Sequence, residues 1–199
     1  SDFTISSHNL ALSYVRTFGL SNKLARVQVS LPYTFMDGSQ TRTNGDVLSG
    51  SRSGFGDTKI RFGINLLGSP ALDKAEFRKF EQKTILGVSL VTSIPTGNYL
   101  EDKKINIGTN RWAFKPEIGV SKRFAHFYAE VYGGIWFYTN NTDYLGKILK
   151  QKNTYSTQAH ASYYFKNNMW VGFNTNWFFG GKTIIDGVSD DSEIDNWRV

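Results

Sequence analysis

The residues of this sequence that most resemble a catalytic pair are a histidine and a serine two positions apart. His160 and Ser162 share one parity with Gln158, in a run that alternates polar and apolar residues. A nucleophile and its base need a mutual hydrogen bond, an orienting group and an oxyanion hole. Residues two apart on a strand lie about 7 Å apart at the backbone, which is too far for that bond. We therefore predict that the protein is not an enzyme.

Metal, thiol and phosphate chemistry find no support in the residue types or their spacing. His8, His126 and His160 show no metal-ligand spacing, and the chain contains no cysteine. Cysteine-ligated zinc, iron–sulfur clusters and thiol catalysis are therefore excluded. The glycine-rich run at 54–57 is no phosphate cradle, because no helix follows it to bind an anion at its N-terminus. We predict neither a metal nor a cofactor.

Charged side chains at alternating positions offer a different chemistry, which is the attraction of ions. If they line a lumen, seven basic and three acidic residues leave a balance of +4, and fixed charges in a narrow pore bias which ions enter. The alternative is a structural ladder of salt bridges, such as Lys115 with Glu117 or Asp57 with Lys59. The lumen-facing candidates are Arg26, Asp57, Lys59, Arg61, Lys83, Arg111, Lys115, Glu117, Arg123, Glu130 and His160.

The alternation itself predicts the elements that position these charges. Successive side chains of a strand point to opposite faces, so each such run has one polar and one apolar face. An aromatic content of 15% favours strands, and 19 glycines favour turns. Eight strands are predicted, at 10–18, 25–33, 58–65, 86–94, 112–123, 127–137, 155–165 and 169–179.

Strand length and loop length place the apolar faces in lipid. The strands are about ten residues long, which suffices to cross a bilayer at a tilt. Aromatic residues gather near strand ends, and short connections alternate with long ones. The sequence predicts an all-β, antiparallel transmembrane β-barrel in the outer membrane of a Gram-negative bacterium, with membrane lipid as a partner. The lipid-facing candidates are Phe62, Val88, Leu90, Phe114, Val131 and Phe173.

Other architectures fit less well, and one segment departs from the pattern. A soluble lipocalin-like barrel would place the same apolar residues around an internal ligand. Nucleic-acid binding is not predicted despite a net charge of +6, because basic and aromatic residues lie on opposite parities. A helical membrane protein is excluded, because no apolar run approaches about 20 residues. Segment 67–81 should be a short turn, yet its sequence indicates a charged, helical insertion.

The order of the connections bears on the extent of the domain. Outer-membrane barrels normally begin in the periplasm, so their first connection is a long external loop, whereas here the connection 19–23 is short. We therefore expect a strand before Ser1 and a further strand opening at 196–199. Residues 1–199 are expected to form a single β-barrel domain truncated at both ends, from a barrel of about twelve strands. We expect either an open curved sheet whose first and last strands lack partners, or a barrel completed by protein outside this sequence.

Two short motifs carry a family resemblance. The run Gly54-Phe55-Gly56-Asp57 opens one predicted strand, and Pro95-Thr96-Gly97 closes the next. They resemble the G-x-G-D and L-P-T-G motifs of the outer-membrane barrel family of phenol meta-pathway transporter-like proteins, with Ile94 in place of the usual Leu. From the residues alone we expect these motifs to be structural, with glycine supplying positive φ at strand boundaries and proline ending the ladder. The structural motif residues are Gly54, Gly56, Asp57, Pro95, Thr96 and Gly97.

The resemblance implies a function. It implies a channel that lets small hydrophobic or aromatic compounds cross the outer membrane. The inner charge balance adds an expected mild preference for anions. The remaining alternative is a structural or partner-binding barrel without transport, which would dock an envelope protein through the long loops 36–53 and 180–196.

Overall fold

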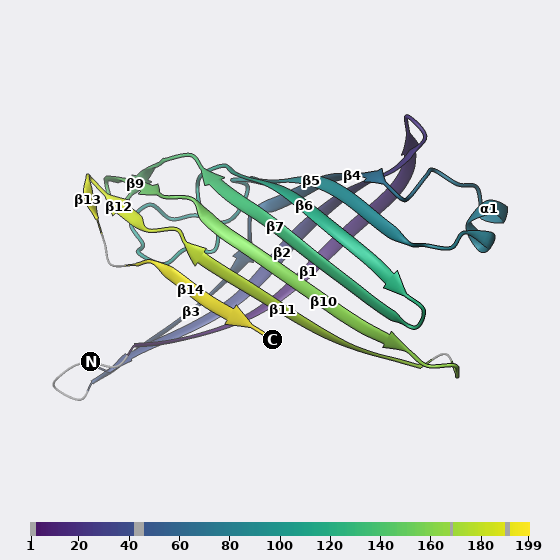
Figure 1. Cartoon of the computed structure of the whole chain (residues 1–199). Helices are drawn as coiled ribbons and strands as arrows, with labels where there is room; N and C mark the ends of the chain where they lie inside the picture. The colour runs from purple at the N-terminus through teal and green to yellow at the C-terminus, as the bar shows by residue number, and fades with distance from the viewer. Residues whose placement is uncertain (1–2, 42–45, 168, 190–191) are drawn as a thin grey trace.

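The computed structural model describes residues 3–41, 46–167, 169–189 and 192–199. Its main feature is a ten-stranded antiparallel sheet in the order β1-β2-β4-β5-β6-β7-β10-β11-β14, with β3 paired to β2 (Figure 1). All eight predicted strands are present in this sheet. Its strands are β1 (Phe3–Leu20), β2 (Lys23–Thr41), β3 (Val47–Phe55), β4 (Thr58–Leu67), β5 (Thr84–Ile94), β6 (Ala113–Phe124), β7 (Phe127–Tyr138), β10 (Thr154–Tyr164), β11 (Trp170–Gly180) and β14 (Ile194–Arg198).

Apart from the connection between β4 and β5, short connections between neighbouring strands of the main sheet lie at one end and long connections at the other, as the sequence predicted (Figure 1). Two residues join β1 to β2, and two join β6 to β7. Ser21, Asn22 and Ala125 in these turns have φ values of 48°, 60° and 50°. Such left-handed residues allow a tight turn that matches the twist of the flanking strands.

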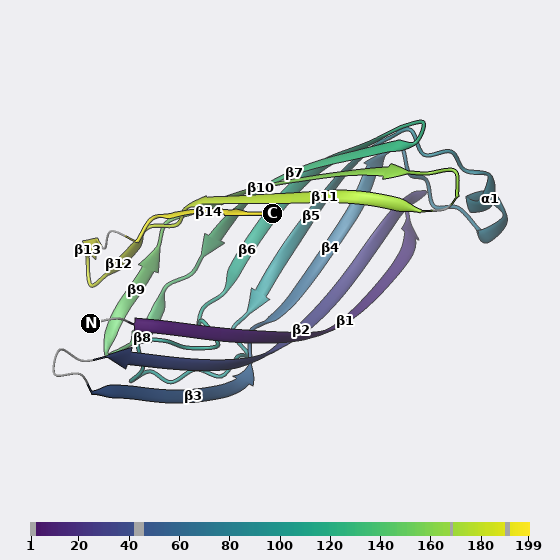
Figure 2. The same cartoon turned by 90° about the horizontal axis from the view of Figure 1, so that it is seen from below.

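A helix lies in the connection between β4 and β5, at the same end as the short turns (Figure 2). This helix, α1 (Lys74–Lys79), begins with a capping box. One carboxylate oxygen of Asp73 accepts from the backbone N–H groups of Ala75 and Glu76 at 2.8 Å each, and Glu76 accepts from the Asp73 N–H at 3.0 Å. The box satisfies amide groups that a helix start leaves free, which explains the helical insertion predicted here.

The long connections contain more strand than the sequence predicted. The expected loop 36–53 is largely the extended hairpin of β2 and β3. The connection 139–153 and the expected loop 180–196 contribute a second, four-stranded sheet made of β8 (Asn141–Tyr144), β9 (Lys147–Gln151), β12 (Thr183–Ile185) and β13 (Val188–Ser189). Two-residue turns at Leu145-Gly146 and Asp186-Gly187 have positive φ at both positions. Such turns are typical of β-hairpins, and the sequence analysis did not predict hairpins here.

The main sheet curves into a trough. Figure 2 shows β1, β2 and β3 along one wall, β10, β11 and β14 along the other, and β4 to β6 between them. Among the described residues, only Ala25, Val91 and Ala113 form a buried apolar core. Several large apolar residues are exposed, including Phe62 at 41% and Val131 at 55%. The ladders and cross-strand pairs therefore hold this sheet together, without a conventional hydrophobic core.

The sheet is open among the residues that the structure describes. β1 pairs with β2 on one side only, and β14 pairs with β11 on one side only. This is the open curved sheet predicted from the order of the loops.

Candidate functional site on the concave face

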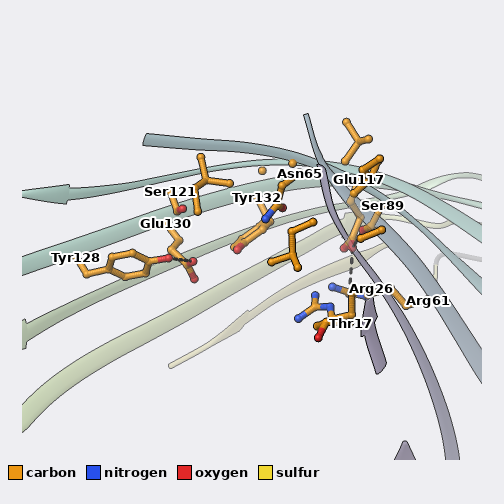
Figure 3. A pocket seen from close by; sticks show the side chains of 18 residues that line it. Thr17, Arg26, Arg61, Asn65, Ser89, Glu117, Ser121, Tyr128, Glu130 and Tyr132 are labelled. Carbon is orange, nitrogen blue, oxygen red and sulfur yellow. Dashed lines mark hydrogen bonds and ion pairs between the residues drawn. The ribbon is translucent and has the colours of Figure 1, made fainter. Parts of the chain in front are cut away.

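A polar pocket lies on the concave side of the trough (Figure 3). Its volume is about 240 Å³, and its lining reaches from Thr17 on β1 to Tyr128 on β7. Neighbouring strands lie about 4.8 Å apart, so strands this distant in the sheet share a cavity only where the sheet curves toward itself. The charged lining residues all belong to the polar parity, and they are Arg26, Arg61, Glu117 and Glu130.

Glu117 lies at the centre of an ion-pair network. Its Oε1 is 3.0 Å from Arg61 Nη2, and its Oε2 is 2.5 Å from Lys115 Nζ. The Ser89 hydroxyl donates a further hydrogen bond to Oε1 at 2.9 Å. The Glu117 side chain is 9% exposed. One carboxylate thus serves two cations, which leaves this group with a net positive charge.

Glu130 and Tyr132 form the opposite wall of the pocket. The Tyr128 hydroxyl donates to Glu130 Oε1 at 2.6 Å and accepts from Gln82 Nε2 at 3.1 Å. The Tyr132 ring lies against the backbone of Gly119, where an added Cβ would be 2.1 Å from ring carbon Cδ1. Only glycine therefore fits at position 119 while Tyr132 keeps this rotamer.

The two sequence motifs meet at the long-connection end of the trough. Asp57 is 7% exposed. Its Oδ1 accepts from the Gly97 N–H at 3.0 Å, and its Oδ2 accepts from the Thr109 N–H and hydroxyl at 2.9 and 2.6 Å. We call Asp57, Gly97 and Thr109 the Asp57 clasp. Because Asp57 binds loop groups, it forms no ion pair with Lys59, and that part of the predicted salt-bridge ladder is wrong.

Close approach, and not backbone conformation, explains the motif glycines. An added Cβ would lie 2.5 Å from Asn98 Oδ1 at Gly54, 2.9 Å from Pro32 Cγ at Gly56, and 2.7 Å from the Gly108 Cα at Gly97. None of these three motif glycines has a positive φ. These glycines are needed for close packing, so their expected structural role agrees with the structure. The expected cause, a positive φ at the strand boundary, is wrong.

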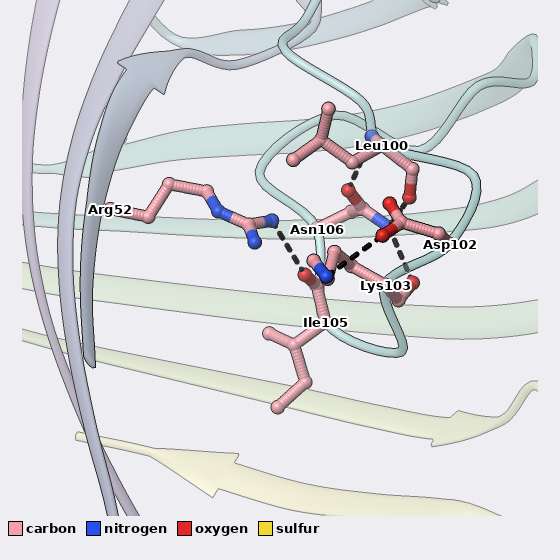
Figure 4. A network of polar contacts seen from close by, with 6 residues as sticks. All are labelled: Arg52, Leu100, Asp102, Lys103, Ile105 and Asn106. Carbon is pink, nitrogen blue, oxygen red and sulfur yellow. Dashed lines mark hydrogen bonds and ion pairs between the residues drawn. The ribbon is translucent and has the colours of Figure 1, made fainter. Parts of the chain in front are cut away.

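The loop between β5 and β6 is organised by its own polar contacts (Figure 4). Asn106 accepts from the Leu100 N–H at 2.8 Å and donates to the carbonyls of Leu100 and Lys103 at 3.0 and 2.9 Å. Arg52 reaches from β3 and donates to the Ile105 carbonyl at 3.1 Å. At the exposed tip, Lys103 lies 2.8 Å from Asp102 and lowers the pKa of that carboxyl.

A second set of contacts fixes the same loop to the small sheet. The Tyr99 hydroxyl donates to the Asp143 carbonyl at 2.9 Å and accepts from Asn141 Nδ2 at 2.8 Å. Arg111 donates to the Gln151 side chain and lies 4.7 Å from the centre of the Tyr138 ring. Burial lowers the pKa of Arg111. The loop is therefore held from β3, from Asp57 in the β3–β4 connection and from the small sheet.

The predicted inner residues separate into groups that the sequence did not distinguish. Arg26, Arg61, Glu117 and Glu130 line the pocket, and Lys115 joins them through Glu117. Asp57 and Arg111 belong to the loop end. Lys83 and Arg123 lie near the short turns, where the Arg123 N–H donates to the Lys83 carbonyl at 2.9 Å, and Lys59 is exposed on β4.

His160 and Ser162 do not form a pair. His160 Nδ1 lies 2.5 Å from Asn174 Oδ1, and the buried Ser162 hydroxyl has no hydrogen-bond partner among the described residues. The described residues also contain no cluster of three or more potential metal ligands. No described helix is long and apolar enough to cross a membrane.

Several residues of this site escaped the sequence analysis. Thr109 and Asn98 lie in an irregular loop, where period-two alternation carries no information about facing. Tyr132 belonged to the polar parity of its strand but carried no charge to single it out. The glycines that pack against these residues could have indicated them, because a glycine inside a strand often marks a close approach of another group.

Comparisons with known proteins agree with this architecture. A model of the protein family described as "Putative MetA-pathway of phenol degradation" matches residues 1–198. The crystal structure of an outer membrane channel from Pseudomonas putida F1 superposes with a TM-score of 0.80 at 23% sequence identity, over 99% of this chain and 70% of that one. A search of curated proteins gave no match. The structural match establishes a shared fold.

Proposed function

The chain belongs to the family of the MetA pathway of phenol degradation, and on that premise we propose that it is an outer membrane channel for small hydrophobic or aromatic compounds. The observation that carries this proposal is a charged concave face backed by an exposed apolar convex face, on the fold of an outer membrane channel. The predicted outer-membrane location agrees with that fold.

The proposal assigns each face of the sheet an environment. Apolar side chains on the convex face contact lipid, because alternating strands of a membrane barrel point one parity outward. Five of these residues are exposed, and Val88 is half-buried. Polar side chains on the concave face line the lumen, in a barrel of about twelve strands to which residues 1–199 contribute one continuous domain. The lipid-facing set is Phe62, Val88, Leu90, Phe114, Val131 and Phe173.

The charge of the concave face supports a mild anion preference. Around the pocket, Glu117 neutralises only part of the charge of Arg61 and Lys115, and Arg26 adds a further cation. Fixed positive charge in a narrow lumen raises the local concentration of anions. The solutes are therefore expected to be neutral or anionic, and cations of equal size should pass more slowly.

Reconstitution into liposomes tests this function. Flux of benzyl alcohol, benzoate and benzylamine, which share a ring and differ in charge, would be measured against protein-free liposomes. We expect flux of the neutral and anionic compounds, with the cation slowest. Absence of flux for all three would overturn the channel and leave a structural or partner-binding barrel. A soluble carrier is disfavoured, because its apolar face would line the cavity.

A further inference from the structure

Three glycines on neighbouring strands form the floor of the concave-face pocket. Gly63 lies on β4 and Gly87 on β5, and Gly87 pairs directly with Gly119 on β6. The Asn65 amide approaches the position above Gly87, and Ser89 approaches that above Gly63. The Tyr132 ring covers Gly119 and forms an aromatic wall beside this floor. A pocket of about 240 Å³ with one aromatic wall has room for a planar ring packed against Tyr132.

One side of this floor carries an uncommitted cation. Arg26 extends from β2 beside Arg61 (Figure 3), and it forms no hydrogen bond or ion pair within the part of the chain that the structure describes. Arg61, in contrast, already binds Glu117 at 3.0 Å. A guanidinium presents donors in a planar fork that matches a carboxylate in two parallel hydrogen bonds. Arg26 is therefore the group in the pocket best suited to an anionic substituent.

The other side of the floor carries a negative charge. Glu130 lies there and accepts a hydrogen bond from the Tyr128 hydroxyl at 2.6 Å. A second carboxylate on the same ring would approach Glu130 and be repelled. Rejection of this kind contributes to specificity as much as attraction does.

We propose that this pocket is a binding site for aromatic monocarboxylates, with the ring packed against Tyr132 and the carboxylate at Arg26. The inference rests on the proposed channel function and names a solute class for it. Glu130 selects against dicarboxylates, and Arg26 selects against neutral aromatics. Benzoate is the simplest molecule that satisfies all of these conditions.

Calorimetric titration of the detergent-solubilised chain tests the site directly. The probes are benzoate, benzyl alcohol and terephthalate, which carry one, no and two carboxylates on the same ring. We expect benzoate to bind at least about tenfold more tightly than either of the others, the range for a hydrogen-bonded charge. The substitution Arg26→Gln should remove that advantage, and Arg26→Lys should restore part of it. Tyr132→Ala should weaken all three probes together.

A matched control separates a local contact from general electrostatics. Lys79→Gln removes the same charge from the exposed helix α1, away from the pocket, and should leave benzoate affinity unchanged. Equal binding of benzoate and benzyl alcohol, or equal losses in the two charge variants, would overturn the site. Flux in liposomes without benzoate binding would overturn the site but keep the channel, whereas binding without flux would keep the site and overturn the channel.

Discussion

The Asp57 clasp and the Glu117 network each hold one carboxylate of the same parity, yet the two carboxylates have different partners. Asp57 accepts only from backbone N–H groups and a hydroxyl of the β5–β6 loop. Glu117 accepts from two cationic side chains and a serine. A carboxylate bound by backbone groups fixes chain geometry, whereas one bound by side-chain cations adjusts the charge of a surface. Parity predicts where a carboxylate points, and its partners determine what it does.

The largest effect should follow from breaking the clasp. Asp57→Ala removes three hydrogen bonds to a charged, buried acceptor and leaves buried donors unsatisfied, so the free energy of unfolding should fall by about 3–5 kcal/mol. Denaturant unfolding in lipid vesicles, followed by tryptophan fluorescence, measures this. Asp57→Asn keeps one acceptor oxygen and should lose less. A loss of under about 1 kcal/mol for the alanine variant would show that the clasp is not structural.

The next effect sharpens the contrast between the two faces. Val131→Arg places a charge on the convex face and should cost about 2–4 kcal/mol if the residue lies at the bilayer midplane. Asn174→Arg, on the concave face, is the matched control and should be tolerated. The same unfolding measurement applies to both variants. Equal costs at the two positions would contradict the assignment of faces.

Removing the charge of Glu117 should have a smaller effect on the free energy of unfolding and a clear effect on ion selectivity. Glu117→Gln leaves Arg61 and Lys115 without their shared carboxylate, so we expect a loss of about 1–3 kcal/mol and stronger anion selectivity. Reversal potentials across a planar bilayer under a salt gradient report that selectivity. An unchanged reversal potential would mean that the network is only a salt-bridge ladder.

The smallest effect is expected at the exposed tip of the loop. Lys103 lowers the pKa of Asp102 below its ordinary value of 3.8. The stabilisation is therefore fully present above that value and is lost as the pH falls through the lowered folded-state pKa. Because the pair is exposed and screened, Asp102→Asn should leave the unfolding midpoint at pH 7 unchanged. A measurable shift there would place this pair among the structural contacts of the loop.

The sequence predicted the strands far better than the contacts between them. Period-two alternation identified all eight long strands and the parity of Arg61, Glu117 and Glu130, because the side-chain period of a strand is local. The clasp could not be predicted in this way, since Asp57 meets Gly97 and Thr109 across 40 and 52 residues. The small sheet was not predicted because its strands are too short to show alternation. Its two-residue turns were the local indication of hairpins.

The span of the Asp57 clasp also bears on the order in which the protein folds. Most ladders of the main sheet join strands that follow one another in sequence, so they can form by successive hairpins. The clasp joins groups 40 and 52 residues apart, and its loop-closure entropy is smaller once β4, β5 and β6 are already paired. It should therefore form after the folding transition state. Interactions that form this late mainly slow unfolding, so loss of the clasp should shorten the lifetime of the native state while the folding rate stays nearly unchanged.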